Sequence, residues 1–273
     1  MEIIISVFIC LTIAYFILIL PRVFDKPDSS EYLNWLYAHR GLHDNETAYP
    51  ENSMAAFKRA IEYGFGIEMD IQLTKDRIPV VFHDFDLKRM CGVDRKVNEY
   101  YYSDLKRFKL ARSTETIPTF EEVLNEVDGR VPLIVEFKGE TTDISLCPIA
   151  DNILRNYYGM YCMESFNPLM VKWYKDKHPG VMRGQLSDNF MKEGMKHNIV
   201  NIALKNLLFN VFSKPDFIAY NKKYPNTLSK RLCRNLYGIR AAAWTIKSEE
   251  ELAEARKDYD MFIFDSFIPE SRS

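Results

Sequence analysis

The chain has 273 residues, 47% of them apolar, and its 36 Lys and Arg nearly balance 38 Asp and Glu, for a formal net charge of −2. This globular composition suits one large domain or two small ones, and without a basic surplus we expect no nucleic-acid partner. The five scattered cysteines show no CxxC spacing, so most are expected to be free thiols, as in a reducing compartment.

The first segment, Ile3 to Leu20, carries no charged residue. As a helix its 18 residues would span about 27 Å, close to the thickness of a bilayer core. A cleaved signal peptide needs a basic start and a small-residue cleavage site, and a core helix needs a polar stripe. Neither pattern is present, so the sequence predicts a transmembrane anchor over residues 1–24, followed by a linker over residues 25–32.

The charges around this segment predict its orientation. No Lys or Arg precedes it, whereas Arg22 and Lys26 follow it closely. The positive-inside rule therefore favours a single-pass protein of the cell membrane that contacts the bilayer through this helix and has the rest of the chain in the cytoplasm. The opposite orientation stays open, because the bias rests on two residues.

Strands and helices alternate over residues 33–273. The expected strands are the short apolar runs at 36–38, 66–71, 133–137, 160–166, 181–186, 215–220, 241–246 and 261–264. The expected helices lie between them, at 53–63, 120–127, 149–157, 169–178, 228–236 and 248–259. Strict β/α alternation predicts a parallel sheet with helices outside, and this many units in this length predict a closed (β/α)8 TIM barrel, an α/β fold.

One more strand, Pro79 to Phe82, does not fit the alternation. It follows the preceding strand too closely for a parallel crossover, so we expect a hairpin that returns His83 to the neighbourhood of Glu68 and Asp70. The polar, Tyr-rich stretch 85–118 then interrupts the pattern. Long loops of this kind are often functional, and we expect an excursion over the mouth of the barrel.

Charged residues recur at every second position of two predicted strands. Glu68 and Asp70 share one face of their strand, as do Glu136 and Lys138 on the next strand but one. Charges that face a barrel interior are costly unless they are paired or bind a metal. The alternative, that they face solvent or each other, stays open, but three carboxylates together favour Mg²⁺ or Ca²⁺ over zinc.

Two of the five histidines end predicted strands. His39 follows the first strand and His83 ends the hairpin, so both are candidates for general acid/base chemistry. His43, His178 and His197 are expected to be solvated or to cap helices. The sequence alone does not say which of His39 and His83 is the acid and which the base.

The segments AHRG, PENS, EMDIQLTKDRIPVVFHD and VEFKG, followed by ESFNP and AAAWTI, together resemble the glycerophosphodiester phosphodiesterase family. The resemblance covers nearly all of the chain after residue 24, and departs where FDSFIP replaces the family's Thr-Asp-x-Pro. It implies a PLC-like TIM barrel that uses one divalent cation, Mg²⁺ or Ca²⁺. Its reaction would be hydrolysis of glycerophosphodiesters, in glycerophospholipid metabolism, to sn-glycerol 3-phosphate and an alcohol.

The resemblance also assigns roles to residues of this chain. It implies an acid/base pair at His39 and His83. It implies metal ligands at Glu68, Asp70 and Glu136. It implies phosphate-binding cations at Arg40 and Lys138, and Phe166 and Trp244 are expected to line the substrate pocket.

Two other functions stay open. The nearer is a lysophospholipase D or a sphingomyelinase-D-like enzyme, which would share the barrel and the chemistry but act on a lipid. The more distant is a non-catalytic, membrane-tethered binding barrel, which the intact set of motif residues disfavours. The preferred alcohol and the oligomeric state are not predicted.

Overall fold

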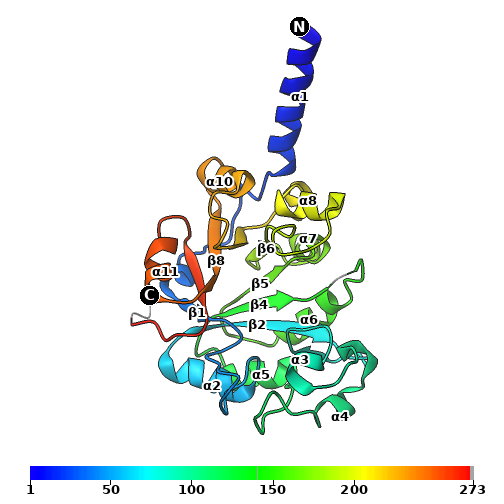
Figure 1. Cartoon of the computed structure of the whole chain (residues 1–273), viewed down its shortest axis with the longest axis vertical. Coiled ribbons are helices and arrows are strands. Elements are labelled where there is room, and N and C mark those ends of the chain that lie inside the picture. The colour runs from blue at the N-terminus through cyan, green and yellow to red at the C-terminus, as the bar shows by residue number, and fades with distance from the viewer. Residues whose placement is uncertain (140, 271–273) are drawn as a thin grey trace.

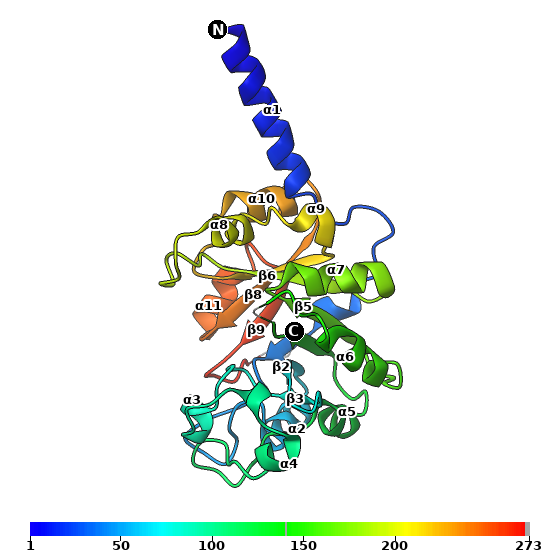
Figure 2. The same ribbon diagram turned by 90° about the vertical axis from the view of Figure 1, so that its right-hand side faces the viewer.

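The computed structural model describes residues 1–139 and 141–270 (Figures 1 and 2). Within them, eight parallel strands form a barrel that closes because β1 pairs with both β2 and β9. The strands are β1 (Leu36–Ala38), β2 (Gly66–Leu73), β4 (Leu133–Phe137), β5 (Tyr161–Ser165), β6 (Arg183–Ser187), β7 (Phe217–Asn221), β8 (Arg240–Ile246) and β9 (Met261–Phe264). The predicted TIM barrel is confirmed.

Helices surround the barrel and bury their apolar faces against it. They are α2 (Met54–Tyr63), α5 (Phe120–Val127), α6 (Leu146–Leu154), α7 (Pro168–Lys177), α8 (Ile199–Lys205), α9 (Asn210–Ser213), α10 (Leu228–Asn235) and α11 (Glu249–Ala255). Several begin at caps that the sequence encodes. The Ser53 hydroxyl accepts a hydrogen bond from the Ala56 amide at the start of α2, and Ser248 caps α11 in the same way.

The barrel interior changes character along the strands. A buried apolar cluster that includes Ile134 and Cys162 fills its lower part. Two residues further along the same strands, on the same face, stand Glu136 and Glu164. The apolar layer therefore supports a charged layer at the carboxyl ends of the strands, which is where TIM barrels carry their active sites.

The predicted hairpin is present. β3 (Pro79–Val81) pairs antiparallel with the end of β2, with Val81 opposite Ile71 and Pro79 opposite Leu73. The Phe82 amide then donates to the carbonyl of Asp70 at 2.9 Å. This pairing brings the next residue, His83, to the charged end of β2.

Residues 85–118 form a compact unit with α3 (Lys88–Cys91), η2 (Val97–Glu99) and α4 (Tyr102–Leu105). It has an apolar core of its own, continuous with β3, that includes Leu87, Val97, Leu105 and Ile117. The packing of this core explains how a polar, Tyr-rich stretch keeps a defined structure. The unit borders the charged end of the barrel through α3 (Figure 1).

The N-terminal helix, α1 (Glu2–Leu18), corrects one prediction. It projects from the barrel with its apolar side chains exposed (Figures 1 and 2). Among the described residues, no helix combines the length and apolarity needed to cross a membrane. The prediction of a transmembrane anchor over residues 1–24 is therefore wrong, and so is the single-pass placement in a cell membrane that rested on it.

The physical reason is that the helix ends earlier than the apolar run. The 17 residues of α1 end at Leu18, although the apolar run continues to Leu20. Pro21 follows and disfavours helical backbone at Leu20. Ile19 is fully buried in the domain, where its carbonyl accepts a hydrogen bond from Asn210 Nδ2 at 3.2 Å. The end of the apolar run thus belongs to the core of the domain.

Candidate active site

Three buried carboxylates meet at the carboxyl ends of β2 and β4. Glu68 and Asp70 lie on β2 and Glu136 lies on β4, directly opposite Asp70 in the strand register. Oxygen atoms of all three lie within 4.8 Å of one another. Burial, and then the charge of Asp70, raise the pKa of Glu68 well above its usual value, and burial also raises that of Glu136. The arrangement concentrates negative charge and can hold a metal ion.

Two cations reach into this cluster. Lys138 Nζ lies 3.0 Å from Glu136 Oε1 and 3.3 Å from Asp70 Oδ1, with only 7% of the lysine side chain exposed. The Arg40 amide donates to Glu68 Oε2 at 3.0 Å, and its guanidinium Nε lies 3.5 Å from Asp70 Oδ2. Burial opposes ionisation of Asp70, but the charge of Lys138 holds its pKa well below the usual value. Three carboxylates and two cations leave a formal charge of −1.

His39 lies between this cluster and the end of β9. Its Nε2 is 4.0 Å from Glu68 Oε2, and its Nδ1 is 3.4 Å from Asp265 Oδ2. Asp265 Oδ1 also lies 3.3 Å from His43 Nε2. Burial, and then the charge of Arg40, lower the pKa of His39 to about 4. A proton on Nδ1 shared with Asp265 leaves Nε2, on the carboxylate side, as a proton acceptor.

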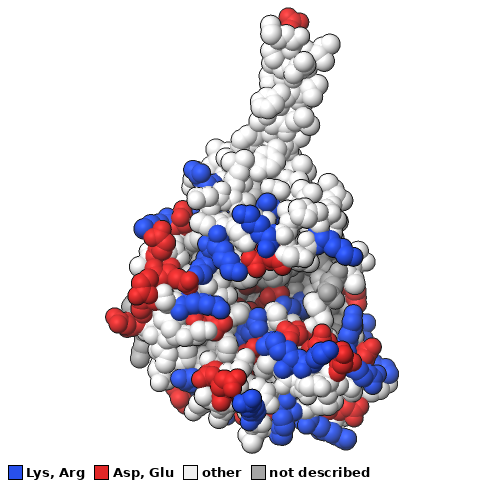
Figure 3. Space-filling view, in the orientation of Figure 1, with Lys and Arg blue, Asp and Glu red and all other residues white. Residues whose placement is uncertain are grey.

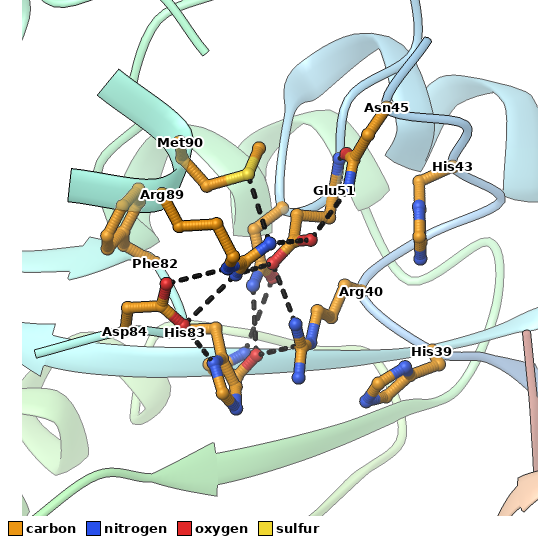
Figure 4. Close-up of polar contacts among 12 residues, drawn as sticks. His39, Arg40, His43, Asn45, Glu51, Phe82, His83, Asp84, Arg89 and Met90 are labelled. Carbon is orange, nitrogen blue, oxygen red and sulfur yellow. Dashed lines mark hydrogen bonds and ion pairs between the residues drawn. The ribbon is translucent and has the colours of Figure 1, made fainter. Parts of the chain in front are cut away.

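His83 is connected to Arg40 through alternating charges (Figure 4). Its Nδ1 lies 2.6 Å from Asp84 Oδ1, and Asp84 accepts from Arg89 Nε at 2.7 Å. Arg89 also donates to Glu51 at 2.6 and 2.7 Å, and Glu51 accepts from Arg40 Nη1 at 2.7 Å. The network fixes the position of His83 relative to Arg40.

The bend after β1 has left-handed backbone. Arg40 has φ +55°, Gly41 has φ +80° and Asn52 has φ +54°. Asn52 Nδ2 donates to Asp70 Oδ2 at 2.9 Å. This turn is what allows Arg40, which follows His39 directly, to point into the same site.

Phe166 directly follows β5 and Trp244 lies on β8. Their rings meet edge to face with centroids 5.8 Å apart, and Phe166 contacts Phe190 in the same way at 6.0 Å. Phe166 lines a cavity of about 790 Å³ that also reaches Glu136 and Lys138. Trp244 is absent from the described residues that line this cavity and packs against Phe166 instead. Figure 3 shows charged side chains gathered around a hollow on this face of the barrel.

Sequence reasoning missed several residues of this arrangement, among them Asp84, which binds His83, and Asn52, which donates to Asp70. His43, expected to be solvated or capping, has only 13% of its side chain exposed, next to Asp265. A signal existed for Asp265, because it directly follows the last strand, as His39 follows the first. Glu51 lies within the PENS segment, just before the helix expected at 53–63, and was assigned no role of its own. Arg89 carries no signal of its own in a stretch rich in charges.

A TIM barrel with clustered carboxylates, fixed cations and two imidazoles at its carboxyl end is built to process an anionic ester. Residues 39–265 match the model of the glycerophosphoryl diester phosphodiesterase family. The chain therefore belongs to that family. It is a phosphodiesterase, and the non-catalytic barrel considered from the sequence is set aside.

Individual relatives agree with this assignment. This chain is 40% identical to a glycerophosphodiester phosphodiesterase of Bacillus altitudinis over 110 residues, which are 38% of this chain and 44% of the relative. It is 28% identical to the glycerophosphodiester phosphodiesterase of Caldanaerobacter subterraneus over 229 residues, which are 79% of this chain and 86% of the relative. An Oleispira antarctica phosphodiesterase, solved in complex with the product sn-glycerol 3-phosphate, superposes with a TM-score of 0.69. That match covers 86% of this chain and 94% of the other at 21% identity, and shows the shared fold.

Proposed function

We propose that this enzyme hydrolyses glycerophosphodiesters to sn-glycerol 3-phosphate and an alcohol, with one divalent cation, Mg²⁺ or Ca²⁺. The observation that carries the proposal is the set of three buried carboxylates, Glu68, Asp70 and Glu136, with oxygens within 4.8 Å of one another. Hard carboxylate oxygens suit these two ions. The names of the relatives support the substrate class, and the product bound to the Oleispira protein supports the product.

The charges of the site fit this substrate. Glu68, Asp70 and Glu136 would hold the cation, which supplies Lewis-acid polarisation of a phosphoryl oxygen when bound. With a divalent ion the formal charge of −1 on the cluster becomes +1, which matches the −1 of a phosphodiester. Lys138 and Arg40 then bind and orient the phosphate from two sides.

The two imidazoles share the proton transfers. One accepts a proton from the attacking oxygen, which belongs to water or to the glycerol hydroxyl of the substrate, and the other protonates the leaving alcohol. Burial, and then the charge of Arg40, lower the pKa of His39, so its ring is neutral at pH 7. The hydrogen-bonded pairs His39–Asp265 and His83–Asp84 orient the rings for these transfers.

The test is a hydrolysis assay with glycerophosphocholine and glycerophosphoethanolamine, with and without EDTA. Chelation should abolish activity, Mg²⁺ or Ca²⁺ should restore it, and Glu68→Gln should be nearly inactive. His39→Ala and His83→Ala should each lose about 10²-fold or more of kcat, the range of proton-transfer catalysis.

A control histidine separates these effects from general damage. His178 pairs with Asp151 at the carboxyl end of α7, away from the cluster, so His178→Ala should keep its kcat. Full activity in EDTA, with no metal found by elemental analysis, would contradict the metal-dependent reaction.

A further inference from the structure

A fourth buried carboxylate faces the cluster from β5. Glu164 lies directly opposite Glu136 in the strand register, as Glu136 lies opposite Asp70, so the three residues form a row across β2, β4 and β5. Paired residues of neighbouring parallel strands point to the same face of the sheet. Only 2% of Glu164 is exposed. The proposed reaction gives this residue no part.

The contacts of Glu164 differ from those of its neighbours in the row. Lys138 Nζ lies 3.3 Å from an oxygen of Asp70 and 3.0 Å from one of Glu136. Glu164 Oε2, by contrast, is buried and has no hydrogen-bond partner among the described residues. A buried polar atom without a partner costs free energy, and native proteins satisfy most such atoms with water or an ion. The free oxygen therefore points to a ligand that the chain itself does not supply.

The charges around Glu164 favour a cation as the source of that ligand. Burial, and then the charge of Glu136, raise the pKa of Glu164 well above its usual value; Asp70 acts in the same direction and Lys138 opposes it. The two fixed cations of the site, Lys138 and Arg40, both contact Asp70, at the other end of the row. A positive charge close to Glu136 and Glu164 relieves the repulsion between their carboxylates.

The distances indicate that Glu164 reaches this cation through water. It is not one of the three carboxylates whose oxygens lie within 4.8 Å of one another. Oxygens that bind one Ca²⁺ directly are at most about 5 Å apart, twice the length of a roughly 2.4 Å bond. Mg²⁺ usually keeps several of its waters in protein sites, and Ca²⁺ sites include waters as well. A water on the cation can donate a hydrogen bond to a carboxylate oxygen.

We propose that Glu164 is a fourth carboxylate of the cation site, and that it accepts hydrogen bonds from the waters of a cation held by Glu68, Asp70 and Glu136. The inference rests on the proposed function and deepens it, because it extends the cation site to a third strand. Glu164 acts on the substrate phosphate only through the cation, so it is a positioning residue.

The experiment measures cation binding directly. Isothermal titration calorimetry of the full chain with CaCl2, and separately with MgCl2, should show one ion per chain. Glu164→Gln, which removes the charge and keeps the shape, should weaken binding by about 10- to 100-fold, the range for groups that support metal ligands from outside. Glu164→Asp, which keeps the charge, should bind more tightly than Glu164→Gln. Hydrolysis of glycerophosphocholine by Glu164→Gln should recover its kcat at higher cation concentration, whereas Glu68→Gln should stay nearly inactive.

A buried aspartate outside the site provides the matched control. Asp151 is also 2% exposed, but it pairs with Arg155 and His178, away from the cluster. Asp151→Asn should therefore bind Ca²⁺ and Mg²⁺ as the native chain does. In thermal unfolding without a divalent cation, Asp151→Asn should lose stability because it breaks these pairs. Glu164→Gln should lose little, since Oε2 has no partner to lose.

The outcomes separate the two proposals. Equal affinities of Glu164→Gln and the native chain overturn the role of Glu164 and leave the proposed function standing. Two ions per chain, one of them lost in Glu164→Gln, assign Glu164 to a separate site and also overturn the inference. So does an equal loss of affinity in Asp151→Asn, which shows general damage. A native chain that binds neither ion and is fully active in EDTA overturns both the inference and the metal-dependent reaction.

Discussion

At the scale of single residues, Glu51 connects the two sides of the site without facing the carboxylate cluster itself. Its side chain accepts hydrogen bonds from Arg40, from Arg89 and from Asn45 Nδ2, the last at 2.9 Å. Burial alone would raise its pKa, but the hydrogen bonds from Arg89 and the charge of Arg40 lower the pKa of Glu51 to about 2. The network that fixes Arg40 is therefore ionised, and it also stabilises the fold.

This pKa predicts how the stability of the protein depends on pH. The pKa of about 2 in the folded state lies below the roughly 4.3 of an unfolded glutamate. Its stabilisation, up to about 3 kcal/mol, is present above the unfolded pKa and is lost as pH falls toward 2. Glu51→Gln should therefore be less stable than the native chain at pH 7, and the difference should narrow between pH 5 and pH 3. Urea unfolding at a series of pH values measures it.

A surface glutamate provides the control. Glu46 lies 3.5 Å from Arg112 with 78% of its side chain exposed, so Glu46→Gln should change the free energy of unfolding by less than about 1 kcal/mol. A gap between the Glu51→Gln variant and the native chain that stays constant from pH 7 to pH 3 would count against the ionised network.

At the scale of elements, the connection from β1 to α2 sets the position of Arg40. Gly41 occupies left-handed backbone with φ +80° and has no room for a side chain, because a Cβ there would come within 2.9 Å of the Ala56 backbone. The Leu42 amide also donates to the Ala56 carbonyl at 3.1 Å. The turn is thus packed directly against the first helix, and any shift of it moves Arg40.

A pair of glycine variants tests this packing. Gly92 also has left-handed backbone, with φ +73°, but a Cβ there would find nothing within 4 Å. Gly41→Ala and Gly92→Ala should both lose about 1 kcal/mol of stability to backbone strain, and Gly41→Ala should lose a further 1–3 kcal/mol or so to overlap. Gly41→Ala alone should lower kcat/KM. Equal losses of stability and unchanged activity in both variants would show that the turn has room to adjust.

At the scale of the whole molecule, the segment after α1 is part of the barrel. Ile19 is fully buried, the Leu20 carbonyl accepts from Lys214 Nζ at 3.1 Å, and the Arg22 amide donates to the Pro215 carbonyl at 3.1 Å. None of the residues of α1 itself is buried. Residues 19–22 therefore stabilise the domain, and so does the end of α1, where Tyr15 packs against the core and the Phe16 carbonyl accepts from the Tyr237 hydroxyl at 3.0 Å.

Two truncations should separate these parts. Removal of residues 1–14 should leave the thermal midpoint of the domain nearly unchanged, because none of these residues is buried. Removal of residues 1–23 also deletes the buried Ile19, which costs about 2–5 kcal/mol, and should lower the midpoint by about 5 °C or more. Differential scanning calorimetry of both truncations measures the effect, and equal midpoints would show that residues 15–23 do not stabilise the domain.

The sequence by itself determined the barrel and the placement of the carboxylates. Strand periodicity puts Glu68 and Asp70 on one face, and the spacing of Pro79 to Phe82 requires the hairpin that returns His83 to the strand end. These are local rules, because side-chain direction and crossover length depend on neighbouring residues only. They hold without knowledge of what packs against each element.

Tertiary structure alone decided the partnerships between distant segments. Asp265 meets His39 and His43 because the barrel closes, and Arg89 reaches Glu51 because the 85–118 unit folds on its own core and brings α3 to the site. The end of α1 was decided in the same way. An apolar run has the same composition whether it spans a bilayer or buries its last residues in a domain. Ile19 is buried in the domain, where its carbonyl accepts a hydrogen bond from Asn210.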